Sequence, residues 1–377
     1  MPIGYFLNQN FRQIGGLNMK FSLTKSVAGA VFGAGLLFSG SAGAVDWKMA
    51  TPWGGGVLLE EMKQLAVKIK AATEGRVNIT VFPAGTFGKA LKVTDSVKSG
   101  VAQVGHNWMG YDWGIDKTTV IFGGYVGGLN EEEFFLWLYE AGGAKLWEQY
   151  RMEKFGVVSM PCGIFPAEIF LHSKKKVTNL EEYKGIKQRT AGAWAEVGGS
   201  LGATTVILPG TEVYPALERG VIDATEWSSP SINEPVGFHK IAKYIIFPGI
   251  HQPGATQECE FNKKAWDALE DRDRKAIRKV AELAVFQSWR NYAYKDLFAY
   301  RRMEKGGNTM LRLEQSFIDV AQKAGNDWAD GVVKKEPNNK WFKKALNHQR
   351  QFQHDMSVYS KMRSAPGSRT AIGKVLK

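Results

Sequence analysis

The stretch "ALERGVIDATEWSSP" (residues 216–230) reads as the end of a helix, a glycine that stops it, and a short strand ending on an acid and a tryptophan. A second stretch, "SVKSGVAQVGHNWMGYDWG" (96–114), begins with the same helix–glycine–valine pattern and also ends on polar and aromatic residues. Asn107 follows Gly100 by seven positions, and Trp227 follows Gly220 by the same number. Two similar units, far apart in the chain, predict two related lobes that share one cleft.

The rest of the chain alternates strands with helices, which predicts an α/β fold with a largely parallel sheet in each of two lobes. A chain of 377 residues is long enough for about two domains. One long helix is predicted over 131–151, a nearly continuous one over 263–305 that can span both lobes, and further helices near 314–332 and 340–363. The predicted domains are residues 1–44 as a leader, 45–155 with about 248–295 as lobe I, and 156–247 with about 296–377 as lobe II and C-terminal helices.

The N-terminal region has the pattern of a secretory signal peptide. "MKFSLTKSVAGAVFGAGLLFSGSAGAVDW" (19–47) carries two early lysines, a short apolar run and a small-residue "AGA" before Val45. Cleavage is predicted after Ala44, with Met19 as the alternative start of translation. The alternative reading is a membrane anchor, but the apolar run falls short of the ~20 residues that a span needs. We therefore expect a periplasmic protein.

Charge and cysteine content set further bounds. The formal net charge is +12, but lysines and arginines are mixed with acids, and no nucleic-acid-binding motif is present. Attraction of anionic solutes or of an acidic partner surface is therefore favoured over nucleic-acid binding. Cys162 and Cys259 are the two cysteines, and a disulfide between them or two separate buried thiols are both consistent with export.

Enzyme motifs are missing from the sequence. It contains no nucleophile elbow, no P-loop and no paired-histidine metalloprotease helix, and its six histidines show no metal-ligand spacing. Each histidine is therefore interpreted as an ordinary core or surface residue. An exported enzyme acting on keto acids is the weakest functional class, because no acid–base pair is visible.

Binding is better supported, because ligands of open α/β sheets lie beyond the carboxyl ends of the strands. The candidate side chains at such ends are Trp53, Asn107, Trp108, Tyr111, Arg189, Glu226 and Trp227. A guanidinium at the position of Arg189 offers a planar pair of donors that matches a carboxylate, and a structural salt bridge is the alternative. Glu226 with the Trp227 carbonyl forms an oxygen set suited to Na⁺ or Ca²⁺, although a plain surface carboxylate is the alternative.

At these residues the chain resembles the solute-binding subunits of tripartite ATP-independent periplasmic (TRAP) transporters, specifically the subgroup that binds α-keto acids and related monocarboxylates. The likeness covers nearly all of the chain after the leader and is most specific in "YKGIKQRTAG" and "VYPALERGVIDATEW". The resemblance implies a two-lobed periplasmic-binding fold with crossing strands and a long connecting helix. It also implies that the lobes close around a carboxylate, which is then delivered to a membrane permease.

Carried over by position, the resemblance implies that Arg189 pairs with the substrate carboxylate, and that Glu226 and the Trp227 carbonyl hold a cation with the indole against the ligand. Near "FPAEIF" the subgroup usually presents a glutamine, whereas this chain has Glu168; near "GIHQPG" a glutamate is common, whereas this chain has Gln252. The number of carboxylates at these two positions is the same as in the subgroup, but the negative charge is at position 168 instead of position 252. Glu168 and Gln252 therefore join the predicted cation ligands, with Glu168 also facing the substrate.

The same "FPAEIF" stretch and its continuation contain Phe165 and His172, which suggest an altered pocket wall. The predicted function is capture of a small organic acid, with no catalysis and no organic cofactor. The alternative is an extracytoplasmic carboxylate sensor or scavenger on the same fold. The expected partners are the acid, the TRAP permease and, through the long helix and the C-terminal helices, a second copy of the chain; packing within one chain is the alternative use of those helices.

Overall fold

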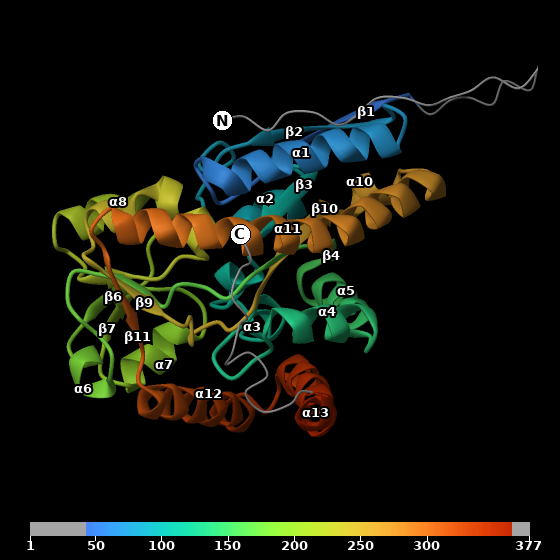
Figure 1. The fold of residues 1–377 in the computed structure, drawn as a ribbon. Coiled ribbons are helices and arrows are strands. Elements are labelled where there is room, and N and C mark those ends of the chain that lie inside the picture. The colour runs from blue at the N-terminus through green and yellow to red at the C-terminus, as the bar shows by residue number, and fades with distance from the viewer. Residues whose placement is uncertain (1–42, 364–377) are drawn as a thin grey trace, which may run out of the picture. The chain divides into compact units, whose positions relative to one another are not determined.

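The computed structural model describes residues 43–363 and contains two mixed β-sheets surrounded by helices (Figure 1). The five-stranded sheet has the order β2-β1-β3-β10-β4. Its strands are β1 (Val45–Ala50), β2 (Val77–Phe82), β3 (Val104–Asn107), β4 (Val157–Phe165) and β10 (Ala255–Asn262). The six-stranded sheet has the order β11-β9-β5-β8-β6-β7. Its strands are β5 (Leu171–Ser173), β6 (Lys187–Arg189), β7 (Thr204–Val206), β8 (Ala224–Thr225), β9 (Tyr244–Phe247) and β11 (Thr309–Arg312).

One strand in each sheet runs against the others. β10 pairs antiparallel with both β3 and β4, and β5 pairs antiparallel with both β8 and β9, while the remaining pairs are parallel. The largely parallel sheets predicted from the sequence are therefore found with one reversed strand each. The reason is the chain path, because β5 and β10 each follow a strand of the other sheet, β4 and β9, with no helix in between.

The helices cover the sheets and connect them. The helices before the second sheet are α1 (Gly56–Ala72), α2 (Val93–Lys98), η1 (Met109–Asp112), α3 (Thr119–Gly123), α4 (Glu131–Tyr139) and α5 (Gly143–Phe155). The helices between the strands of the second sheet along the chain are α6 (Leu180–Tyr183), α7 (Trp194–Ser200), α8 (Gly210–Glu218), α9 (Pro230–Asn233), η2 (Glu234–Val236) and η3 (Phe238–Lys240). The final helices are α10 (Lys263–Asp267), α11 (Asp271–Lys305), α12 (Gln315–Lys335) and α13 (Lys340–Arg363).

The single long helix predicted over 131–151 is wrong, because two helices, α4 and α5, occupy this region. Gly142 separates them in the left-handed conformation, at φ 84°. A glycine takes this conformation without steric cost, and it interrupts helical hydrogen bonding. Helical periodicity continues on both sides of the break, so the sequence pattern did not reveal it.

The two helix-to-strand units are confirmed, one in each sheet. α2 is followed by Gly100 at φ 80° and then β3, and α8 is followed by Gly220 at φ 75° and then β8. In both units the left-handed glycine ends the helix and turns the chain into the strand. β3 therefore ends at Asn107 in the first sheet, and β8 delivers Glu226 and Trp227 in the second.

The core of the first sheet contains a buried ionic network. The Arg151 guanidinium on α5 is fully buried and forms ion pairs with Asp112, Glu258 and Glu260 at 3.0, 2.6 and 2.9 Å. It also donates to Thr94 Oγ1 at 2.9 Å. Such a network fixes the relative positions of the elements that carry it, because each buried charge is costly unless its partner is in place. It ties together α2, η1, α5 and β10.

Helix α11 contacts a strand of the first sheet and the helix α9 that follows β8 of the second sheet. It packs against β4 and α1 on one side and against α9 on the other, and Figure 1 shows it running past α1 toward α8. Strand β11 then joins the second sheet, and α12 packs on α7. Helix α13 instead packs on α3, α4 and α5, next to the first sheet, whereas residues 296–377 are predicted to belong to lobe II. β4 likewise stays in the first sheet to Phe165, beyond the predicted limit at 155. The lobe boundaries stay a prediction.

None of the helices within residues 43–363 combines the length and the apolar character that crossing a membrane would require. The predicted leader lies outside the described residues, apart from Gly43 and Ala44. The first strand begins at Val45, the residue that follows the predicted cleavage position.

Cys162 on β4 and Cys259 on β10 form a disulfide, which settles the choice that the sequence left open. The bond joins two neighbouring antiparallel strands in the core of the first sheet, and the cysteines are 97 positions apart in the sequence. A crosslink over a loop of this length removes much of the conformational freedom of the unfolded chain.

We predict that the double substitution Cys162→Ala with Cys259→Ala lowers the free energy of unfolding by about 2–4 kcal/mol. Urea denaturation followed by tryptophan fluorescence measures this change. Wild-type protein in excess dithiothreitol serves as the control and is expected to match the double variant. Equal stability of wild type and variant under oxidising conditions would contradict the prediction.

Candidate functional site

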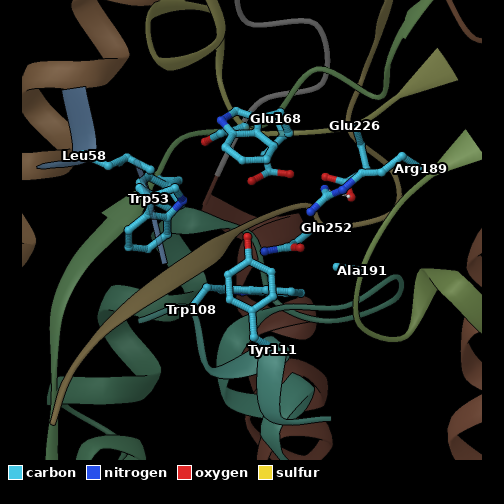
Figure 2. A pocket seen from close by; sticks show the side chains of 12 residues that line it. Trp53, Leu58, Trp108, Tyr111, Glu168, Arg189, Ala191, Glu226 and Gln252 are labelled. Carbon is cyan, nitrogen blue, oxygen red and sulfur yellow. Dashed lines mark hydrogen bonds and ion pairs between the residues drawn. The ribbon is translucent and has the colours of Figure 1, made fainter. Parts of the chain in front are cut away.

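A small enclosed cavity lies where the carboxyl ends of strands from both sheets meet (Figure 2). Trp53 follows β1, Trp108 follows β3, Arg189 ends β6, and Glu226 follows β8. The loops between β4 and β5 and between β9 and β10 complete the wall. The lining residues are Trp53, Leu58, Trp108, Tyr111, Phe165, Glu168, Arg189, Ala191, Glu226, Trp227, Ser228 and Gln252.

All but one of the predicted site residues line this cavity. The exception is Asn107, whose side chain is buried inside the first sheet with its Nδ2 3.5 Å from Thr94 Oγ1. Successive side chains of a strand point to opposite faces, so Asn107 belongs to the buried polar network around Arg151 rather than to the cavity. His172 is also absent from the lining, and its Nε2 lies 3.1 Å from Asn233 Nδ2. Phe165 does line the cavity.

Arg189 is held rigidly, with only 2% of its surface exposed. Its Nε and Nη2 donate to the Leu208 carbonyl at 3.1 and 3.0 Å, and its Nη1 donates to Glu226 Oε1 at 2.9 Å. A guanidinium has five N–H donors, so two remain for groups inside the cavity such as the Tyr111 hydroxyl or a ligand. The salt bridge considered as an alternative is thus present, and it coexists with donors left for binding.

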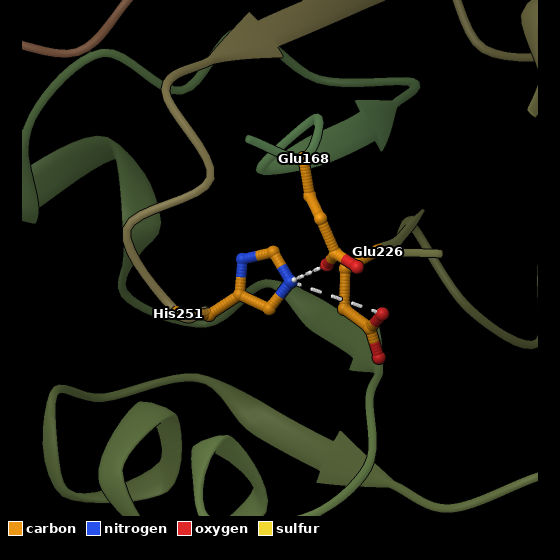
Figure 3. A group of neighbouring side chains, drawn as sticks. All are labelled: Glu168, Glu226 and His251. Carbon is orange, nitrogen blue, oxygen red and sulfur yellow. Dashed lines mark hydrogen bonds and ion pairs between the residues drawn. The ribbon is translucent and has the colours of Figure 1, made fainter. Parts of the chain in front are cut away.

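Glu168, Glu226 and His251 form a buried cluster next to Arg189 (Figure 3). His251 Nε2 lies 2.9 Å from Glu168 Oε2 and 3.9 Å from Glu226 Oε2. One ligand atom from each of the three residues lies within 4.8 Å of the other two. The cluster combines two carboxylates with one imidazole, a donor set that suits a cation.

Burial controls the protonation of this cluster. It raises the pKa of Glu168 well above its usual range, against the opposing effect of the Arg189 charge. It raises the pKa of Glu226 as well, against the opposing effect of the Arg189 charge. Burial also lowers the pKa of His251 to about 4, so the imidazole is neutral at neutral pH. The Glu168–His251 contact is therefore a hydrogen bond rather than an ion pair of two charged groups.

Aromatic side chains form the rest of the wall. Tyr111 packs edge-on against Trp108 with ring centroids 5.1 Å apart, and its hydroxyl points into the cavity in Figure 2. The Arg189 guanidinium carbon lies 5.2 Å from the centre of the Trp227 ring, a cation–π contact. Trp53 packs on His106 at 4.7 Å. These rings exclude water and strengthen the electrostatic interactions inside.

The cavity is small, with a volume of about 30 Å³. A cavity needs about 10–15 Å³ to hold one water molecule, so this one has room for about two. A buried guanidinium beside two acids in so small a space can select a compact, planar anion. Gln252 closes one side, with its Nε2 3.3 Å from the Gly123 carbonyl.

Sequence reasoning missed His251, because its isolated position suggested an ordinary histidine. Its neighbour Gln252 was already a predicted site residue, and this adjacency was the available signal. Leu58, Ala191 and Ser228 were also missed. Leu58 comes from the first turn of α1, and nothing in its local sequence distinguishes it from a core leucine.

Comparison with known proteins gives a consistent result. The family model of bacterial extracellular solute-binding proteins, family 7 (DctP), matches residues 47–335. A monocarboxylate 2-oxoacid-binding periplasmic protein from a Nostoc species is 30% identical over 75% of this chain and 78% of its own length.

Two solved structures are similar in fold and sequence. A TRAP transporter solute-binding protein from Bordetella bronchiseptica, a dimer of mixed occupancy with copurified calcium and picolinate, matches with a TM-score of 0.81 and 25% identity over 85% of this chain and 95% of its own. A TRAP periplasmic solute-binding protein from Pseudoalteromonas atlantica with bound sodium and pyruvate matches with a TM-score of 0.78 and 27% identity over 85% and 97%. The predicted two-lobed fold and the predicted family are confirmed, and these relatives are solute-binding proteins rather than enzymes. This chain belongs to family 7 of the bacterial extracellular solute-binding proteins, the DctP family.

Proposed function

We propose that this protein is the receptor of a TRAP transporter for a small monocarboxylate of the 2-oxo acid class, which Arg189 binds through its carboxylate. The observation that carries the proposal is the buried Arg189 guanidinium, which lines the cavity and has two N–H donors that neither Leu208 nor Glu226 uses. The ligands named for the relatives, which include 2-oxo acids and picolinate, share a carboxylate next to a second acceptor atom. Such a group accepts hydrogen bonds from a guanidinium in a fixed plane.

We propose further that a cation shares the site. Burial by itself raises the pKa of Glu168 and of Glu226 and so favours their protonated acids. When both are ionised, they and an ionised ligand place three negative groups against the single positive charge of Arg189. Buried charge of one sign is costly unless it is compensated. A Na⁺ or Ca²⁺ ion held by Glu226, Glu168, the Trp227 carbonyl and Gln252 supplies the missing charge, and the cluster geometry supports a position near the two carboxylates.

The remaining parts of the proposal concern the working cycle. Export by the signal peptide with cleavage after Ala44 is supported by the start of the first strand at Val45. Hinge closure of lobes I and II is supported by the cavity, because its wall contains residues from both sheets. The closed receptor then delivers the acid to the membrane permease. A sensor or scavenger without a permease remains the alternative use of the same site.

We predict that pyruvate in the presence of Ca²⁺ or Na⁺ raises the melting temperature of the wild-type protein by about 2–5 °C at ligand concentrations well above Kd. Propionate, which lacks the 2-oxo group, is the matched control and is expected to give a smaller shift. Exchange into chelator-treated, sodium-free buffer is expected to remove most of the pyruvate shift. A full shift without any added cation would reject the cation, and no shift with any carboxylate would reject the function.

We predict that Arg189→Lys weakens pyruvate binding by about 100-fold or more, because one ammonium cannot reproduce the planar set of donors to Leu208, Glu226 and the ligand. Isothermal titration calorimetry measures the change. The control is Arg302→Lys, at an exposed arginine that pairs with Glu234. Normal affinity in a folded Arg189→Lys protein would contradict the assigned role.

We propose that the chain forms a homodimer through α11, because one face of this helix is unusually apolar and exposed. Phe286 and Tyr294 are 53% and 68% exposed, and they share this face with Leu283, Leu297 and Phe298. Exposed apolar stripes of this kind are typical of association surfaces. The Bordetella bronchiseptica relative is described as a dimer.

The dimer makes a specific prediction for size-exclusion chromatography with light scattering. Wild type is expected at twice the chain mass, and Phe286→Glu with Leu297→Glu at the chain mass, because buried charge disfavours association. Val67→Glu, at a 68% exposed position on α1, is the control and is expected to stay dimeric. A monomeric wild type would refute the dimer.

A further inference from the structure

A second hollow lies directly outside the wall of the ligand cavity. Its volume is about 280 Å³, compared with about 30 Å³ for the cavity in the same measure. The glycine run after β1, the start of α8 and the helix η2 surround it. The residues that line it are Trp53, Gly54, Gly55, Gly56, Gly210, Thr211, Trp227, Pro235 and Val236. This hollow is called the outer pouch below.

The outer pouch and the ligand cavity have two residues in common, Trp53 and Trp227. The partition between them therefore includes two indole rings, which are side chains that can change rotamer. The Trp227 ring contacts the Arg189 guanidinium, and its six-membered ring lies against Gly210. A Cβ at Gly210 would be 2.3 Å from Trp227 Cη2, so the indole can occupy this position only because residue 210 is a glycine.

The chemistry of the outer pouch suits an apolar group. Among the described residues that line it, none is ionisable, and the two indoles, Pro235 and Val236 are the largest side chains. Four glycines leave the space unfilled. At Gly55 and Gly56 an added Cβ would meet no atom within 4 Å. The hollow is thus open room bounded by apolar rings and bare backbone, which favours hydrocarbon over charge.

We infer that the outer pouch is a subsite for the apolar side chain of the bound acid, so that the chain selects 2-oxo acids with branched or aromatic tails over pyruvate. This inference rests on the proposed function. Arg189 fixes the carboxylate, and the cavity is too small for a bulky substituent. A tail has to leave the cavity past Trp227 or Trp53, and the outer pouch is the adjoining apolar room, so a shift of one indole joins the two volumes.

Gly55→Leu tests the inference by filling the outer pouch. Gly55 has an extended backbone at φ 174°, which any residue adopts, and open space around its missing side chain. Gly114→Leu is the matched control, because an added Cβ there also meets no atom within 4 Å and Gly114 lies outside the outer pouch. Gly55→Ala adds a smaller group and gives a graded comparison. Calorimetry with pyruvate and with 4-methyl-2-oxopentanoate, in Ca²⁺ buffer, measures affinity in all four proteins.

Wild type is expected to bind 4-methyl-2-oxopentanoate about tenfold or more tightly than pyruvate, because each buried hydrocarbon group adds discrimination of this order. Gly55→Leu is expected to remove that preference while changing the Kd of pyruvate less than about twofold, with Gly55→Ala intermediate and Gly114→Leu unchanged. Equal loss of both acids in Gly55→Leu, or an unchanged preference, would overturn the subsite. Binding of pyruvate alone by wild type would overturn the subsite and retain the proposed function. Binding of neither acid would overturn the proposed function itself.

Discussion

The site depends on keeping one guanidinium charge out of water. A guanidinium buried away from water needs fixed polar groups of the protein around it. At Arg189 the Leu208 carbonyl and the Glu226 carboxylate supply these groups from two different segments, the connection after β7 and the end of β8. Any sequence that supports the site must therefore bring these segments to the end of β6, and the parallel pairing of β6 with both β7 and β8 does so.

The molecule buries a second arginine, Arg151, in the first sheet, but its surroundings differ from those of Arg189. Arg151 on α5 is surrounded by three carboxylates and a threonine hydroxyl, and none of these partners lines the cavity. Arg189 has one carboxylate partner, Glu226, which also belongs to the buried cluster with Glu168 and His251. The first network is complete in itself and holds helices to a sheet. The second keeps donors and acids exposed to an enclosed space, which is the condition for binding an anion together with a cation.

Glycine positions decide how closely the walls of the site approach one another. Gly210 allows the Trp227 ring to lie against the backbone of α8, and Gly54 allows contact with Thr211, since a Cβ there would lie 3.0 Å from the threonine methyl. The indoles can then close a very small cavity while the neighbouring glycines leave open room outside. The size of the ligand is therefore limited by the two indole side chains, which can change rotamer, and by the backbone at Gly54 and Gly210, which cannot be displaced.

The sequence by itself determined the fold class, the two helix–glycine–strand units, the long C-terminal helices and most of the cavity wall. These features depend on local periodicity and on the rule that ligands lie at the carboxyl ends of strands, both of which can be read along the chain. Only the tertiary structure decided that Asn107 turns into the core, that His251 joins Glu168, that the two cysteines pair, and that α4 and α5 are separate. Most of these depend on which face of a strand a side chain occupies, or on contacts between residues far apart in sequence. The break before α5 depends on one left-handed glycine inside a continuous apolar pattern.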